Sequence, residues 1–275
     1  KIRNRDSIFV QTYNIMILLN NEIKDSSGFS EKVLETGLSI YEVIRVFNKR
    51  PIFLKDNILR LSNSLKKSNI GIDAENLNIP AKLDQLISLE NMSEGNLKYV
   101  LHFTTGKTDE YIFQIPHSYP TARDYAEGVP TLTCQAVREN PEVKYLNPDL
   151  RTLTNRLMAE NHVYEILLTD REGYITEGSR SNVFFIKGTT LYTSPQAYVL
   201  PGTSRKRVFD ICKKYGLHVE EKRIAGGHIQ QYESAFLTGT SPLILPINRI
   251  NDIPFNVSHP FLRQLMKYYF ALLNA

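Results

Sequence analysis

The run Ile175–Phe185, which reads Ile-Thr-Glu-Gly-Ser-Arg-Ser-Asn-Val-Phe-Phe, places one acidic residue in a small polar turn between two apolar, β-rich segments. Gly178 and the serines give this turn its conformational freedom. Glu177 stands out, because a carboxylate between two buried strands is costly unless a cation meets it. Taken alone, the stretch favours a simpler interpretation, an exposed hairpin tip. The segments on either side change that balance.

The composition is that of an ordinary globular protein. The 275 residues are 42% hydrophobic and 23% charged, which allows a sizeable core. This length fits one large domain or two modest ones. The net charge of +4 is small, and no run of lysine and arginine is long enough to indicate a nucleic-acid surface. No apolar run approaches membrane-spanning length. We therefore expect neither a nucleic-acid partner nor a membrane span.

The two cysteines, Cys134 and Cys212, lie far apart and match no metal or disulfide spacing. We predict no metal site, and two reduced, buried thiols. The first residues also lack the apolar segment of a secretory signal peptide. These features are typical of a cytoplasmic protein.

Periodicity predicts mixed α/β structure in two parts. The first part has strands over 8–19, 41–47, 52–54, 97–103 and 111–115, a helix capped by Asp56, and a helix over 80–89. Two prolines within 116–120 indicate a boundary. We therefore predict a small N-terminal α/β domain over 1–118 and a larger C-terminal domain over 119–275. The second part has strands over 130–137, 164–168, 174–176, 183–186 and 235–237, and helices over 149–161, over 203–215 and after Pro260.

Two segments offer hydroxyls and backbone N–H groups with no carboxylate beside them. Gly202-Thr203-Ser204 opens a predicted helix, where the free amides and the helix dipole favour an anion such as phosphate. The basic run 205–207 in the first turn of that helix also favours a nearby anion. Gly239-Thr240-Ser241 ends a predicted strand, and Arg60 could add a bidentate contact. Each of these features has a simpler alternative. Hydroxyls at a helix start are often caps, and an isolated arginine such as Arg60 is more often a surface side chain.

Lys144 lies between apolar neighbours, at the junction of a predicted strand and helix. A lysine in partly desolvated surroundings loses proton affinity and becomes a usable amine nucleophile. A solvated surface lysine is the simpler alternative. Together, an amine for a Schiff base, a carboxylate for a pyridinium nitrogen and a phosphate cup are what pyridoxal phosphate requires.

The sequence resembles the class IV (fold type IV) pyridoxal-phosphate enzymes, which include branched-chain and D-amino-acid aminotransferases and 4-amino-4-deoxychorismate lyase. The similarity runs from about residue 19 to about residue 250. The segments that carry it are Tyr41-Glu42-Val43-Ile44-Arg45-Val46, Val143-Lys144-Tyr145-Leu146-Asn147, Thr176-Glu177-Gly178-Ser179 with Ser181-Asn182-Val183-Phe184, and Leu200-Pro201-Gly202-Thr203-Ser204-Arg205.

The resemblance implies a role for each matching residue. Lys144 matches the Schiff-base lysine, and Glu177 matches the partner of the pyridine nitrogen. Tyr41 matches a position that lines the substrate pocket. The residues that match the phosphate site are Arg60, Thr203, Ser204, Gly239 and Thr240. The resemblance also implies a small α/β N-terminal domain, a larger C-terminal domain with the cofactor between them, and a homodimer.

The expected substrate-binding residues are missing. Where D-amino-acid aminotransferases carry an arginine and a histidine for the substrate carboxylate, this chain reads Thr105-Gly106-Lys107-Thr108-Asp109-Glu110-Tyr111. The lyase usually shows Arg-Gly there, and Thr105-Gly106 stands in its place. Lys107 is the candidate substitute cation.

We therefore predict a pyridoxal-phosphate-dependent aminotransferase that exchanges an amino group between an amino acid and a 2-oxo acid. One alternative keeps the cofactor but eliminates pyruvate from aminodeoxychorismate, a lyase reaction. A second alternative is a non-catalytic binding protein that retains the fold.

Overall fold

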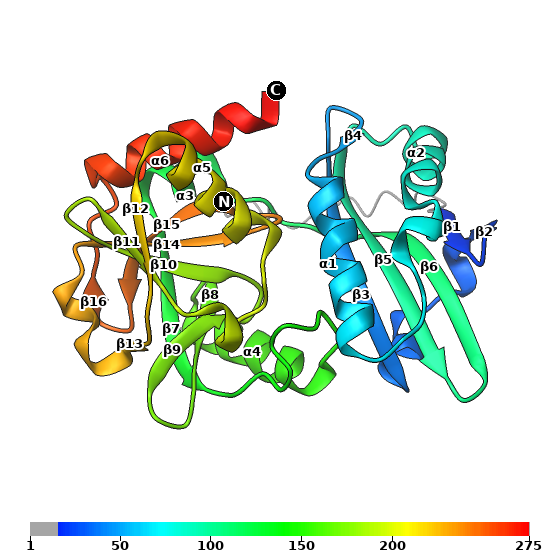
Figure 1. The fold of residues 1–275 in the computed structure, drawn as a ribbon, viewed down its shortest axis with the longest axis horizontal. Coiled ribbons are helices and arrows are strands. Elements are labelled where there is room, and N and C mark those ends of the chain that lie inside the picture. The colour runs from blue at the N-terminus through cyan, green and yellow to red at the C-terminus, as the bar shows by residue number, and fades with distance from the viewer. Residues whose placement is uncertain (1–15, 275) are drawn as a thin grey trace, which may run out of the picture.

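The computed structural model describes residues 16–274 and builds them around two β-sheets that lie side by side (Figure 1). The predicted strand over 8–19 appears as β1 from residue 16 on, and its residues 8–15 lie outside the described part. Among residues 16–274, every helix is too short or too polar to span a lipid bilayer.

The first sheet has six strands in the order β2-β1-β6-β5-β3-β4, all paired antiparallel. Its strands are β1 (Met16–Leu19), β2 (Glu22–Asp25), β3 (Leu38–Phe47), β4 (Arg50–Pro51), β5 (Glu94–Thr104) and β6 (Lys107–Ile115). Helices α1 (Leu54–Lys67) and α2 (Ile79–Leu89) belong to the same part of the chain.

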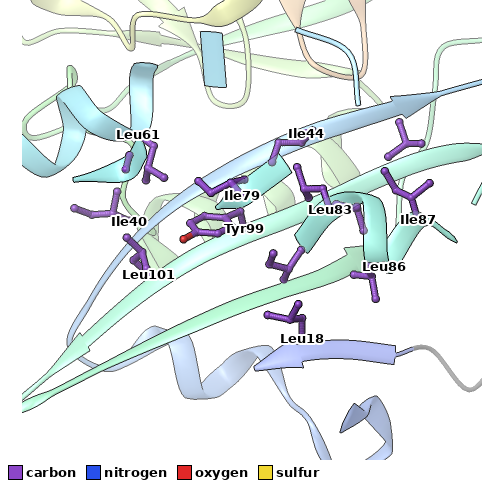
Figure 2. Close-up of a cluster of buried hydrophobic side chains, with 14 of the residues drawn as sticks. Leu18, Ile40, Ile44, Leu61, Ile79, Leu83, Leu86, Ile87, Tyr99 and Leu101 are labelled. Carbon is purple, nitrogen blue, oxygen red and sulfur yellow. The ribbon is translucent and has the colours of Figure 1, made fainter. Parts of the chain in front are cut away.

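Apolar side chains join these two helices to the sheet. Leu61 of α1 and Leu83 of α2 are no more than 1% exposed and face strand residues such as Ile40 and Tyr99 (Figure 2). The helical spacing of these leucines and the alternation along β3 turn both apolar faces toward one core. This core fixes α1, and therefore Arg60, against β3.

The second sheet has ten strands, with the path β12-β11-β10-β14-β15-β7-β8-β9-β13 and β16 paired to β15. Its strands are β7 (Val129–Gln135), β8 (Glu165–Thr169), β9 (Tyr174–Gly178), β10 (Asn182–Lys187), β11 (Thr190–Thr193), β12 (His218–Glu221), β13 (Ile224–Ala225), β14 (Ser234–Gly239), β15 (Leu243–Ile250) and β16 (Ile253–Pro254). The helices of this part are α3 (Ala122–Glu127), α4 (Pro148–Asn161), α5 (Thr203–Tyr215) and α6 (Pro260–Ala271).

Short 3-10 helices occupy several connections: Ser26–Gly28, Glu31–Glu35, Ala74–Leu77, Gln196–Tyr198, Gly226–Gln231 and Leu272–Asn274. The segment 116–121, between β6 and α3, connects the two sheets without regular structure. The predicted division at residues 118 and 119 falls in this segment, and we retain it as a proposal.

Three local expectations are wrong. Helix α1 begins at Leu54, so 52–54 is not a strand, and the left-handed residue Phe53 precedes the helix without a side-chain cap. Asp56 does not cap α1, because its carboxylate pairs with Lys206 and Arg207 of α5. Cys134 is only half-buried, whereas Cys212 is buried as predicted, and both are free thiols.

Candidate active site

A cavity of about 750 Å³ opens between the two sheets and is lined by side chains from both parts of the chain. Tyr41 and Lys98 line it from the first sheet, and Lys144, Glu177 and Thr240 line it from the second part of the chain. The amine and the carboxylate that the sequence singled out therefore face the same space.

Two hydrogen bonds of its backbone fix the position of Lys144 at this cavity. It lies in the loop between β7 and α4, and its carbonyl accepts a hydrogen bond from the Tyr41 N–H at 3.0 Å. Its own N–H donates to Ser64 Oγ at 3.2 Å. Desolvation lowers the pKa of its amine and outweighs the opposing effect of Tyr41, and the charge of Arg60 acts in the same direction as desolvation. These effects favour the neutral amine that a nucleophile requires.

Tyr41 stacks beside this amine, with the Lys144 Nζ 4.7 Å from the centre of its ring. Burial by itself would raise the pKa of the Tyr41 phenol. The positive charges of Lys144 and Arg151 outweigh burial and lower the pKa to about 7. The cavity therefore stabilises negative charge next to the amine.

Glu177 is the last residue but one of β9 and is 2% exposed. Its Oε1 accepts from Arg138 Nε at 2.7 Å, and its Oε2 accepts from the Leu200 N–H at 3.0 Å and from Asn182 Nδ2 at 3.3 Å. Burial raises the pKa of this carboxyl, while Arg138 and these hydrogen bonds oppose the rise. The costly buried carboxylate thus meets its cation inside the protein.

The hydroxyls expected to hold phosphate come together at the start of α5. Thr203 and Ser204 are buried there, and with Thr240 they line a second, small cavity. Thr240 also lines the large cavity, and Gly239 precedes it at the end of β14. Helix α5 has no side-chain cap, so the free N–H groups of its first turn are available to an anion.

Arg60 lies beside this region but is already paired. Its Nε and Nη2 donate to the two oxygens of Glu42 at 2.8 and 2.5 Å, and both side chains are buried. Arg60 does not line the large cavity. Its contact with phosphate stays a prediction, and Glu42 neutralises much of the charge that it would bring.

Lys107 lies outside the cavity. It stands at the start of β6, 67% exposed, and pairs with Asp109 at 2.8 Å. Its proposed role as the substrate cation stays a prediction. The basic run 205–207 is also paired internally, since Arg205 binds Glu221, and Lys206 and Arg207 bind Asp56. These cations need no external anion.

Three arginines that line the cavity are not among the residues predicted from the sequence: Arg138, Arg151 and Arg180. Arg138 stands six residues before Lys144, and Arg180 stands in the middle of the turn after Glu177. Arg180 could have been predicted, because it lies in the same turn as the buried carboxylate Glu177. A cation at that place indicates a site for a charged ligand.

The side chains of the site fit pyridoxal phosphate. Lys144 supplies an amine with a lowered pKa, Glu177 a buried carboxylate, and the start of α5 uncapped N–H groups beside buried hydroxyls. A neutral amine, a ring-nitrogen partner and a phosphate site are the three groups that this cofactor needs.

Comparison with known proteins agrees with this chemistry. Residues 39–250 match the family described as Amino-transferase class IV. A D-alanine aminotransferase from Bacillus licheniformis is 25% identical over 253 residues, covering 86% of this chain and 88% of that protein. An aminodeoxychorismate lyase from Bacillus subtilis strain 168 is 25% identical over 234 residues, covering 80% of each.

A solved structure has the same fold. The T.th. branched-chain amino acid aminotransferase with pyridoxamine 5′-phosphate superimposes with a TM-score of 0.82 at 21% identity and covers 96% of both chains. The chain therefore has the two-part α/β fold of the fold type IV enzymes. It belongs to the class IV aminotransferase family, which confirms the resemblance and the prediction that the protein is an enzyme.

Proposed function

We propose that this protein is a pyridoxal-phosphate-dependent aminotransferase that moves an amino group between an amino acid and a 2-oxo acid. The observation that carries the proposal is that the Lys144 amine, with its lowered pKa, and the buried Glu177 carboxylate face one cavity. The D-alanine and branched-chain aminotransferases among the similar proteins support the same reaction class.

When bound, pyridoxal phosphate supplies an aldehyde that exchanges amino groups and a ring that accepts the electrons of the substrate's α-carbon. Glu177, held by Arg138, would keep a proton on the ring nitrogen, which favours that electron flow. Lys144 Nζ would hold the cofactor, and as a neutral amine it could carry a proton to and from the substrate. Tyr41 stabilises the positive charge that Lys144 acquires when it takes the proton.

The same proposal assigns the phosphate of the cofactor to the site at the start of α5. Thr203 and Ser204, in the first turn of α5, would hold the phosphate together with Gly239 and Thr240. Arg60 supports this site through the atoms that Glu42 leaves free. A cytoplasmic location and a homodimer also remain proposals. Analytical ultracentrifugation tests the dimer, and a monomeric sedimentation coefficient would contradict it.

The test is a transamination assay with the cofactor-loaded protein. L- and D-amino acids are offered in pools with several 2-oxo acids, and new amino acids are detected by chiral chromatography. We expect one pool to yield the amino acid that corresponds to the added 2-oxo acid. The variant Lys144→Ala should yield none. Failure of every pair with a cofactor-loaded protein would contradict the proposal.

The lyase is the second candidate, because aminodeoxychorismate lyase of Bacillus subtilis strain 168 is similar over most of this chain. The same amine can serve both reactions, so the residues do not separate them. Incubation with aminodeoxychorismate decides between them. Release of pyruvate and 4-aminobenzoate, without any transamination, would favour the lyase.

A further inference from the structure

We propose that Arg151 and Arg180 form the binding site for a carboxylate of the substrate. The inference rests on the proposed aminotransferase function and supplies the clamp that the sequence lacks at residues 105–111. The two arginines come from different elements, Arg151 from α4 and Arg180 from the turn between β9 and β10, and both line the 750 Å³ cavity.

Among residues 16–274, neither guanidinium forms a salt bridge with an aspartate or a glutamate, and the nearby groups that can become anionic include the Tyr41 phenol and the Glu165 carboxyl. The neighbouring arginines do form such a salt bridge, since Arg60 pairs with Glu42 and Arg138 pairs with Glu177. Arg180 donates instead to the neutral amide oxygen of Asn155. Two like charges that share a cavity repel each other, and a bound carboxylate removes that cost. Planar guanidinium groups suit a carboxylate, because each can donate two parallel hydrogen bonds.

Glu165, an acid in the same cavity, positions Arg180 rather than pairing with its side chain. Its Oε1 accepts from Ser179 Oγ at 2.7 Å. Its Oε2 accepts from Ser181 Oγ at 2.8 Å and from the backbone N–H of Arg180 at 3.2 Å. This one buried carboxylate therefore fixes the turn on both sides of Arg180, while the guanidinium donates to Asn155.

Helix α4 positions the second arginine. Arg151 and Asn155 are four residues apart and lie on one face of the helix. Since Asn155 holds the Arg180 side chain, this face turns Arg151 toward the same point. Arg151 also stands near the start of α4, where the helix dipole disfavours a cation unless an anion is bound.

The pair lies close to the reacting amine. Arg151 is among the strongest of the positive charges that lower the pKa of Tyr41, whose ring stacks beside Lys144 Nζ. Desolvation and the charge of Arg151 together lower the pKa of Arg180. A carboxylate bound to both arginines would therefore hold its substrate within the part of the cavity that Lys144 reaches.

The test compares Arg151→Gln, Arg180→Gln and the double variant with the parent protein, all loaded with cofactor. Arg156→Gln is the matched control, because Arg156 lies on the same helix but is 65% exposed and pairs with Glu160. The acceptors are 2-oxopentanoate and 2-oxopentanedioate, which share a chain length but carry one and two carboxylates. KM and kcat are measured for both, and calorimetry measures binding of glutarate and pentanoate independently of turnover.

We expect each single variant to raise KM by about tenfold or more while kcat changes little, since a charge-assisted hydrogen bond contributes on the order of tenfold in affinity. Arg156→Gln should leave KM unchanged. A rise for both acceptors identifies the carboxylate next to the reacting carbon. A rise for 2-oxopentanedioate alone identifies the distal carboxylate. Unchanged KM and unchanged carboxylate affinity in the double variant would overturn the proposal, as would an equal effect in Arg156→Gln.

The lysine variants test whether the positive charge is what matters, and the comparison of turnover with carboxylate binding separates the carboxylate site from the proposed function. Arg151→Lys and Arg180→Lys keep the charge and should recover part of the affinity, whereas a purely structural defect would not respond. If no 2-oxo acid is turned over but carboxylate binding still depends on both arginines, the aminotransferase proposal fails and the carboxylate site stands. If turnover is normal and KM is insensitive to both arginines, the carboxylate site fails alone.

Discussion

Arg138 Nε donates to Glu177 Oε1 at 2.7 Å, and the two side chains are only 14% and 3% exposed. The other oxygen of Glu177 is bound by the Leu200 N–H and by Asn182 Nδ2. Burial favours the protonated carboxyl, whereas this arginine favours the carboxylate. Arg138 is therefore the group that most strongly opposes protonation of the buried Glu177 carboxylate, the proposed partner of the ring nitrogen of the cofactor.

The variant Arg138→Gln should move the acidic limb of the pH profile of kcat/KM to higher pH. Burial already raises the pKa of Glu177, and loss of Arg138 removes the main opposing charge, so the pKa rises further. A carboxyl with a raised folded pKa gives stability that is present at low pH and lost as pH rises through that pKa. The variant should therefore also lose stability as pH rises.

Glu177→Gln is the companion to that experiment. It should lower kcat on the order of 100-fold, because it removes the buried charge that faces the cofactor ring, and it should abolish the acidic limb that Glu177 causes. An acidic limb at the same pH in the parent protein and in Arg138→Gln would show that Glu177 does not titrate there.

Tyr41 should titrate far below other tyrosines. Burial raises the pKa of its phenol, but the nearby cations outweigh burial and lower the pKa from 10.0 to about 7. A phenol with a depressed folded pKa gives stability that is present above its unfolded pKa and lost as pH falls through about 7. Ultraviolet difference titration of the parent protein against Tyr41→Phe should show one tyrosinate forming near neutral pH.

The same titration tests the placement of Arg151. Arg151→Gln removes one of the charges that lower the pKa of Tyr41, so the transition should move to higher pH. Arg156→Gln should not move it, because Arg156 is exposed and does not line the cavity. A transition that is the same in both variants would place Arg151 away from Tyr41.

Glu165→Ala should destabilise the fold by about 3 kcal/mol, since it leaves several buried donors without an acceptor. Those donors are Ser179 Oγ, Ser181 Oγ and the Arg180 N–H. KM for 2-oxo acids should also rise as the turn that carries Arg180 loosens. Urea unfolding measures the stability. Glu160→Ala on the exposed side of α4 is the control and should stay within about 0.5 kcal/mol. Equal stability of both variants would contradict the role of Glu165.

Gly202→Ala should weaken cofactor binding. An added Cβ at this position would overlap Asn182 Oδ1, and Asn182 Nδ2 donates to Leu200 O and to Glu177. The backbone of Gly202 suits any residue, so the effect is steric. We expect pyridoxal phosphate affinity to fall by about tenfold, as a repacking cost of about 1–3 kcal/mol implies. Gly227→Ala has open space around its Cβ and is the control. Equal affinities would contradict this account.

Much of the site could be predicted because its signals are local. Glu177 lies in a turn between two apolar strands, and Thr203 and Ser204 open a helix whose face is marked by Val208 and Ile211. The apolar neighbours of Lys144 make it one candidate amine among many, and only the family resemblance assigns it the Schiff-base role, since one lysine among 33 basic residues carries little signal by itself.

The remainder depends on pairing between distant elements, which periodicity does not encode. Glu42 and Arg60 are 18 residues apart, on β3 and α1, and only the packing of these elements shows that they neutralise each other. Asp56 does not cap α1 as predicted, because its carboxylate pairs with two cations of α5 that lie about 150 residues later in the chain. Arg151 and Arg180 likewise become a pair only where α4 meets the β9–β10 turn.

The proposed function depends on Lys144 as the amine that holds the cofactor. Sodium borohydride reduction of the protein loaded with pyridoxal phosphate, followed by peptide mass spectrometry, identifies that amine. We predict one phosphopyridoxyl group per chain, attached to the peptide that contains Lys144, and none at that position in Lys144→Ala. Attachment to another lysine, or no attachment in a protein that binds the cofactor, would contradict the account.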